Sequence, residues 1–123
     1  MYIGAGGHSR SILSLFDPDL YKIHGIFDDL YTSGVEESIM NIKVIGNYND
    51  VPSDMKKVLS IGDNKKRKSL FRKFENDILP NNLIHKTTVV EKNVVLGRSN
   101  QLLSNVYINS CANIGSNNII IEF

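Results

Sequence analysis

From residue 84 onward, the chain places an aliphatic residue at every sixth position. The run is unbroken and comprises Ile84, Val90, Leu96, Leu102, Ile108, Ile114 and Ile120. Only about a quarter of positions in an average chain are Leu, Ile, Val or Met, so chance rarely produces such a run. A six-residue period fits neither an α-helix nor a simple strand, and it is typical of a parallel β-helix. An all-β domain with irregular strands is the alternative.

Two further positions of each hexad support the β-helix. Gly97, Asn109 and Gly115 directly follow aliphatic residues and tolerate the left-handed backbone that a tight corner needs. The residues two places before the aliphatic ones are mostly small or of modest size, with Asn100 and Asn118 as exceptions. We therefore expect the β-helix to occupy residues 87–123.

Residues 1–86 alternate strand-like and helical segments instead. Strands are expected at 1–3, 21–27, 42–45, 58–61 and 83–84, helices at 8–16 and 65–76, and a loop at 30–41. Strands that alternate with helices favour a parallel α/β sheet. The sequence therefore predicts an α/β domain over residues 1–86, followed by the β-helix.

The bulk composition excludes several classes of protein. With 41% hydrophobic and 22% charged residues, the chain has the composition of a globular protein. A net charge of +1 gives no electrostatic reason to expect nucleic acid or an acidic membrane as partner. We find no apolar run of membrane length, no signal peptide and no metal-ligating motif. The single cysteine, Cys111, fits a reducing cytoplasm and is expected to be a small buried filler.

A cluster of basic residues, Lys65-Lys66-Arg67-Lys68 with Arg72 and Lys73, falls on the second predicted helix. A solvated helix face explains such a cluster without any ligand. We therefore interpret its lysines as surface residues.

The expected location of the protein is the cytoplasm.

A glycine-rich turn follows the first predicted strand and opens the first predicted helix. Its sequence is Gly4-Ala5-Gly6-Gly7-His8-Ser9-Arg10, which lacks the third glycine of the dinucleotide fingerprint. Glycines let the backbone approach a ligand closely, and a helix N-terminus favours phosphate. His8 is either a phosphate or base contact or an ordinary first-turn residue.

An acidic pair, Asp28-Asp29, ends the second predicted strand about twenty residues later, where a carboxylate can accept hydrogen bonds from a ribose or sugar. Gly62-Asp63-Asn64 follows the fourth strand, and ligands collect at this edge of such sheets. The alternative is a plain glycine turn, with Asp28 or Asp29 capping a loop.

Together these motifs resemble the NeuD/PglD-type sugar acyltransferases, a hexapeptide-repeat family of sialic acid O-acetyltransferases and UDP-amino-sugar N-acetyltransferases. The resemblance runs over essentially the whole chain and rests on the glycine turn, 25–29, 61–64 with Arg67, 83–85 and the hexads. It implies a Rossmann-like N-terminal domain that binds a UDP- or CMP-linked sugar, and a left-handed β-helix that forms a homotrimer. Acetyl-CoA would bind between neighbouring β-helices.

The resemblance also assigns roles to individual residues. Nucleotide-sugar contacts are implied for the glycine turn and the acidic pair, and for two residues further on: Gly4, Gly6, Gly7, His8, Ser9, Arg10, Asp28, Asp29, Gly62 and Arg67. The family's general-base histidine lies in a later coil than those present here, and more apolar residues usually precede its glycine turn. We therefore expect a chain shortened at both ends, with no catalytic residue of its own, no productive acetyl-CoA binding and a doubtful trimer.

The leading hypothesis is thus a sugar acetyltransferase of bacterial surface-glycan synthesis that binds its nucleotide sugar with little or no acetyl transfer. A non-catalytic binding or assembly module, or a remnant, is the second hypothesis. An NAD(P)-binding domain is the third, and the incomplete fingerprint and the hexads oppose it. The sequence does not identify the acceptor sugar or distinguish O- from N-acylation.

Overall fold

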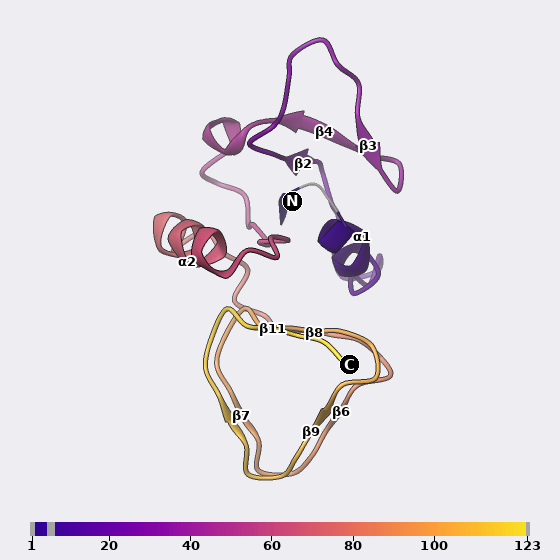
Figure 1. Cartoon of the computed structure of the whole chain (residues 1–123), viewed down its shortest axis with the longest axis vertical. Helices are drawn as coiled ribbons and strands as arrows, with labels where there is room; N and C mark the ends of the chain where they lie inside the picture. The colour runs from indigo at the N-terminus through magenta and orange to yellow at the C-terminus, as the bar shows by residue number, and fades with distance from the viewer. Residues whose placement is uncertain (1, 5–6, 123) are drawn as a thin grey trace. The chain divides into compact units, whose positions relative to one another are not determined.

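The computed structural model describes residues 2–4 and 7–122, and the chain divides into two compact units. These units are Met1–Leu79 and Pro80–Phe123, coloured indigo to pink and pink to yellow in Figure 1. The expected boundary at residue 86 lies later in the chain. The difference arises because Leu83 and His85 donate backbone hydrogen bonds to Asn100 and Leu102, which makes the predicted strand 83–84 part of the second unit.

The first unit is built on a small sheet with strand order β1-β2-β4-β3. Its strands are β1 (Tyr2–Ile3), β2 (Ile26–Phe27), β3 (Ser38–Ile39) and β4 (Ile42–Gly46). The first three in this order are parallel, as predicted, and β3 is antiparallel to β4. Gly4 N–H to Phe27 O (2.6 Å) and Asp28 N–H to Gly46 O (3.0 Å) continue the pairing past the strand ends.

Three departures from the predicted elements occur in and beside this sheet. The expected strand 21–27 is limited to β2, residues 26–27. The expected loop 30–41 contains β3, because Met40 and Asn41 both have positive φ (49° and 66°) and make the tight hairpin turn into β4. Asn41 is a common turn residue, but methionine rarely precedes it in such a turn, and this concealed the hairpin from the sequence pattern. The expected strand 58–61 is buried throughout, but pairing in this stretch of the described chain is limited to single bridges such as Lys57 with Ile78.

Three helical segments accompany the sheet: α1 (Gly7–Leu13), a 3₁₀ turn η1 (Tyr48–Asp50) and α2 (Asn64–Lys73). Asp63 caps α2 by accepting a hydrogen bond from Lys66 N–H at 2.7 Å. The apolar stripe of α2 packs as predicted. Leu70 joins the buried cluster of Leu59, Ile61 and Ile78, with Phe71 and Phe74 against it.

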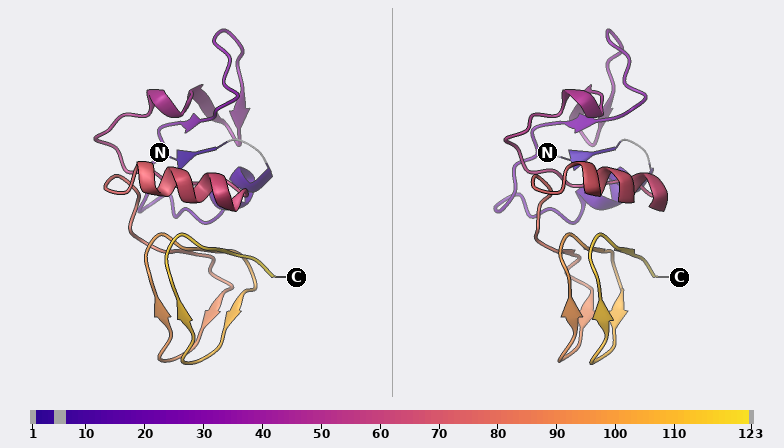
Figure 2. Two further views of the ribbon diagram at one scale, coloured as in Figure 1. Left: turned by 60° about the vertical axis from the view of Figure 1, so that its left-hand side comes forward. Right: turned by 90° about the vertical axis from the view of Figure 1, so that its left-hand side faces the viewer.

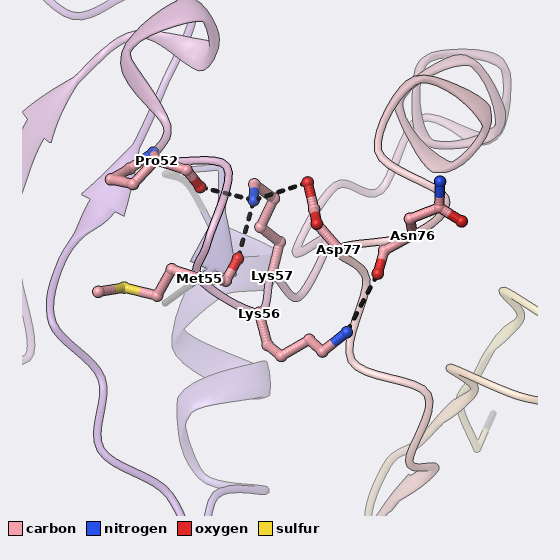
Figure 3. A network of polar contacts seen from close by, with 6 residues as sticks. All are labelled: Pro52, Met55, Lys56, Lys57, Asn76 and Asp77. Carbon is pink, nitrogen blue, oxygen red and sulfur yellow. Dashed lines mark hydrogen bonds and ion pairs between the residues drawn. The ribbon is translucent and has the colours of Figure 1, made fainter.

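A fully buried lysine ties the end of this unit together, as Figure 3 shows. Lys57 has no exposed surface, and its ammonium donates to Pro52 O and Met55 O at 2.8 Å each. Asp77 lies 3.5 Å away and supplies the countercharge. Since a buried charge needs partners, this network holds the loop before Lys57 against the chain after α2.

The second unit is a parallel β-helix with short strands every six residues. Its strands are β5 (Leu83–Ile84), β6 (Val89–Val90), β7 (Val95–Leu96), β8 (Gln101–Leu102), β9 (Tyr107–Ile108), β10 (Asn113–Ile114) and β11 (Ile119–Ile120). They pair as β5-β8-β11, β6-β9 and β7-β10, so each strand meets the one three hexads later. Figure 1 looks down the triangular coils, and Figure 2 shows them stacked.

From Leu96 onward the aliphatic hexad residues fill the interior, as the period predicts, whereas Ile84 and Val90 in the first coil are 40% and 37% exposed. Leu102, Val106 and Ile108 are buried, and Leu96, Ile114 and Ile120 pack against them. The exceptional asparagines form a ladder. Asn100 is fully buried; its N–H donates to Asn82 Oδ1 (2.9 Å), and its own Oδ1 accepts from Asn118 N–H (2.9 Å). The side-chain oxygen of each asparagine therefore accepts a hydrogen bond from the backbone N–H of the equivalent asparagine one coil later.

The corners differ from the prediction. Positive φ values of about 60° recur three places before successive hexad aliphatic residues, at Asn93, Ser99, Asn105, Cys111 and Asn117. Among the expected corner glycines, Gly97 is needed for another reason: an added Cβ would lie 2.5 Å from Ser116 Oγ and 2.6 Å from the Gly115 backbone in the next coil. Cys111 is exposed at its corner, so the expectation of a buried filler was wrong.

No helix within residues 2–4 and 7–122 is both long enough and apolar enough to cross a membrane.

Candidate functional site

A cleft of about 300 Å³ lies in the first unit, at the carboxyl ends of its parallel strands. Gly4 follows β1, Asp28 and Asp29 follow β2, and Tyr48 follows β4. His8 from α1 and Lys66 from α2 complete the polar lining. Ligands of open α/β sheets bind at this edge, because the loops that leave the strand ends diverge there.

The turn after β1 requires glycine at its first position. Gly4 is buried with φ of 109°, and an added Cβ would lie 2.9 Å from Ser60 O. Ser9 Oγ donates to Gly4 O at 2.6 Å and lies 3.0 Å from Ser60 Oγ. Because Ser9 is fully buried, its hydroxyl shapes the turn and does not line the cleft.

The two aspartates have different surroundings. Asp28 is buried, and its Oδ1 accepts from Leu30 N–H at 2.9 Å, which caps the loop after β2. Asp29 is exposed in the cleft, and its carboxylate pairs with the ammonium of Lys66. Hydrogen bonding from Lys66 holds the pKa of Asp29 below its usual range, and partial burial opposes this. Asp29 is therefore the carboxylate that a ligand could reach.

Lys66 and Tyr48 stand beside Asp29. The Lys66 ammonium lies 5.4 Å from the centroid of the Tyr48 ring, within the range of a cation–π contact. Burial, and then the carboxylates of Asp29 and Asp28, raise the pKa of the Tyr48 hydroxyl, which stays protonated at neutral pH. The three groups give the cleft an acceptor, a cation and an aromatic face.

Arg67 is turned away from the cleft. It is buried, and its guanidinium donates to Ile61 O (2.8 Å) and to Asn64 Oδ1 (2.7 Å). Burial lowers the pKa of Arg67, and the nearby Asp63 opposes that shift. These bonds fix the turn at 61–64, so Arg67 supports Gly62 at the cleft wall rather than lining the cleft itself.

The structure thus divides the predicted contact residues. Gly4, His8, Asp28, Asp29 and Gly62 line the cleft. Buried Ser9 and Arg67 shape its walls, and exposed Arg10 is outside the lining. Gly7 is the first residue of α1, and Gly6 lies outside the described residues.

Sequence reasoning missed Lys66 and Tyr48, both of which line the cleft. The interpretation of the basic cluster as a solvated face holds for Lys65 and Lys68, which are exposed, and was wrong for Arg67, which is buried. Lys66 keeps a partly exposed side chain that also lines the cleft. Lys66 lies one helical turn before buried Leu70, so the helical period could have placed it on the inward face. Nothing in the sequence around Tyr48 indicated a site.

Metal binding has no structural support in the described part of the chain, where no three His, Cys, Asp or Glu side chains are grouped to hold an ion. The lining of the cleft suits an organic ligand with hydroxyl and anionic groups.

Residues 1–74 match the model of the PglD N-terminal domain family. The chain belongs to this family. Structures of two acetyltransferases resemble it over nearly its whole length. The perosamine N-acetyltransferase of Caulobacter crescentus, in complex with CoA and GDP-perosamine, is 27% identical with a TM-score of 0.85. The match covers 98% of this chain and 58% of that one.

The acetyltransferase domain of PglB from Neisseria gonorrhoeae, in complex with acetyl coenzyme A, shares the fold. It is 18% identical with a TM-score of 0.74, and the match covers 98% of this chain and 60% of the domain. Uncharacterized protein L142 of Acanthamoeba polyphaga mimivirus is 28% identical over 118 residues, which are 96% of this chain and 24% of that protein. The predicted combination of a Rossmann-like domain and a β-helix, and the resemblance to PglD/NeuD-type sugar acetyltransferases, are therefore confirmed.

Proposed function

We propose that the cleft of the first unit binds a nucleoside-diphosphate sugar, and that the whole protein is an acetyl-CoA-dependent sugar acetyltransferase of surface-glycan synthesis. The observation that carries this proposal is the cleft itself. An exposed carboxylate, Asp29, lies with a buried glycine turn at Gly4 on the sheet edge where nucleotides bind in such folds. The likeness to a structure holding GDP-perosamine and CoA supports the same ligand class.

Each wall of the cleft would have a distinct role. Asp29 would accept hydrogen bonds from ribose or sugar hydroxyls, since an ionised carboxylate is acceptor-only. Gly4 lets the backbone pass close to the ligand, and His8 offers a ring nitrogen from the first turn of α1. At about 300 Å³ the cleft is small for a nucleotide and a coenzyme together, so we assign acetyl-CoA to the whole protein and not to this cleft.

Acetyl transfer is a proposal for the whole protein, because these 123 residues span 58% of the perosamine enzyme. Acetyl-CoA would supply the acetyl group to an amine or hydroxyl of the bound sugar. The cytoplasm, which holds acetyl-CoA, is the proposed location. For the whole protein we also propose the homotrimer that the family resemblance implies, which native mass spectrometry tests directly.

Thermal unfolding in the presence of candidate ligands tests the proposed ligand class. UDP-, CMP- and GDP-linked sugars are compared with NAD at equal concentrations. A ligand that binds only the folded state stabilises it by about 2.7 kcal/mol at one hundred times its Kd, so the right one raises the midpoint clearly. We expect a nucleotide sugar to do so. A rise with NAD alone would favour a dinucleotide-binding domain and contradict the proposal.

A further inference from the structure

We propose that Lys66, held in place by Tyr48, is the residue that recognises the diphosphate of the ligand. This inference rests on the proposed function, because it concerns the same cleft. It adds that the site distinguishes a nucleoside diphosphate from the bare nucleoside, and that one lysine makes this distinction. The sequence pattern assigned that lysine to the surface. Lys66 would contact the ligand itself, and Tyr48 would act as a positioning residue.

The geometry places the ammonium of Lys66 inside the cleft. Lys66 is the third residue of α2, and its side chain reaches the carboxylate of Asp29 beyond β2 and the ring of Tyr48 in η1. Three separate segments of the chain therefore meet at this one charge. The side chains of Lys66 and Asp29 are about equally exposed, at 40% and 42%, so a ligand in the cleft can reach both.

The charges of the lining explain why a lysine is needed here. Two carboxylates, Asp28 and Asp29, face the cleft, and a diphosphate is itself strongly negative. Like charges at close range disfavour binding, so an anionic ligand requires a compensating cation. Lys66 is the one lysine or arginine among the described residues that line the cleft. An ammonium has three donors, so Lys66 can keep its ion pair with Asp29 and still donate hydrogen bonds to phosphate oxygens.

Tyr48 fixes where the ammonium stands. It begins a 3₁₀ turn closed by a capping box, in which Asn47 Oδ1 accepts from Asn49 N–H (2.8 Å) and Asp50 Oδ2 accepts from Asn47 N–H (2.9 Å). Its ring also packs against the buried cluster of Leu59, Ile61 and Leu70. A ring held on two sides offers a fixed face to Lys66. A tyrosine hydroxyl is neutral at neutral pH, so Tyr48 adds no further negative charge.

The neighbouring lysines of α2 provide a matched control. Lys65 is exposed on the same helix and does not line the cleft. Lys65→Met and Lys66→Met remove the same charge from adjacent positions, so they change the net charge of the protein equally. Any difference between them reports the location of the charge and not its amount. Lys66→Arg keeps the charge and tests whether a cation alone is enough.

Calorimetric titration of the 123-residue chain with UDP, GDP, uridine and guanosine measures the effect. A lost charge-assisted hydrogen bond weakens binding about tenfold or more, so Lys66→Met should raise the Kd of the better-binding diphosphate by that factor. The Kd of the matching nucleoside should change less than about twofold. Lys65→Met should leave both unchanged, and Lys66→Arg should recover most of the affinity. Urea unfolding of each variant checks that the fold is intact.

The outcomes separate this inference from the proposed function. Binding by the unaltered chain, with equal effects of Lys66→Met and Lys65→Met, would overturn the role of Lys66 and leave the proposed function standing. Equal loss of nucleoside and diphosphate binding in Lys66→Met would also overturn it, since the lysine would then act only by positioning Asp29. An unaltered chain that binds neither nucleoside diphosphate, nor the sugars of the thermal experiment, would overturn both proposals.

Discussion

Asn100 in the β-helix and Lys57 in the sheet unit are both buried with no exposed surface, yet they find their partners in different ways. Asn100 bonds to Asn82 and Asn118, its equivalents one coil before and after. Lys57 bonds to Pro52 O, Met55 O and Asp77, which share no pattern with it or with one another. In a repeat, the residue that satisfies a buried group can be located from the period. In a non-repeating unit it cannot.

The same contrast explains the position of the ligand cleft. The β-helix builds each strand from the same six-residue pattern, so its backbone repeats with the same period. The sheet unit brings together the ends of β1, β2 and β4 with the first turns of two helices, which gives a cleft with a unique set of groups. Sites that recognise one ligand need such unique sets, and loops at strand ends provide them.

Replacing Lys57 is expected to have the largest effect on folding. Lys57→Met keeps the volume but leaves two partly buried carbonyls and Asp77 without their donor, which should cost about 3 kcal/mol of unfolding free energy. Hydrogen exchange of the first unit measures this cost separately from the second unit. Lys56→Met is the control; Lys56 is exposed and donates only to Asn76 O at 3.1 Å among the bonds described (Figure 3). Equal losses in the two variants would contradict the network's role.

Breaking the asparagine ladder should come second, at about 2 kcal/mol. Asn100→Ala removes the acceptor for Asn118 N–H and the donor to Gly115 O (2.8 Å), and both of these groups lie in the next coil. The rate of backbone hydrogen exchange should therefore rise in residues 113–120. Asn109→Ala, at an exposed position of the same unit, should change stability by less than about 0.5 kcal/mol. A β-helix unaffected by Asn100→Ala would show that the ladder contributes nothing.

Two glycines of the hexads offer a steric test of how tightly the coils stack. Gly97→Ala places a Cβ 2.6 Å from the Gly115 backbone and should destabilise the β-helix by about 1–2 kcal/mol. Gly115→Ala meets nothing within 4 Å and should be near neutral. Chemical denaturation followed by circular dichroism compares the pair. The reverse order would mean that the coil spacing differs from that described here.

Cys111 should give the smallest effect, and in the opposite direction. It has φ of 64°, a left-handed conformation that costs most residues about 1–2 kcal/mol and asparagine less. Cys111→Asn should therefore stabilise the β-helix by about 0.5–1 kcal/mol, as measured by denaturant midpoint. Ser110→Asn, one residue earlier and also exposed, should give no gain. A gain in both variants would place the effect elsewhere than in the corner conformation.

Sequence reasoning was most accurate where local pattern decides the structure. The period gave the hexad strands and their inward residues, and the glycine turn and Asp29 gave part of the cleft. It misplaced the corners, because Ser99 and Cys111 adopt positive φ under the constraint of the stacked coils. Tyr48 and Lys66 were missed because their role depends on where three non-adjacent segments meet. Ser9 and Arg67 have suitable chemistry for ligand binding but are occupied in shaping the turns.

The most direct test measures the binding of a nucleoside-diphosphate sugar to the unaltered chain and to a variant of Asp29. The unaltered chain is expected to bind a nucleoside-diphosphate sugar, and Asp29→Asn should weaken this binding about tenfold or more, since a hydrogen bond to a charged acceptor is lost. Asp54→Asn, an exposed position of the same unit, should bind like the unaltered chain. Nucleotide-sugar binding that is equally strong in all three proteins would contradict the assignment of the site to this cleft.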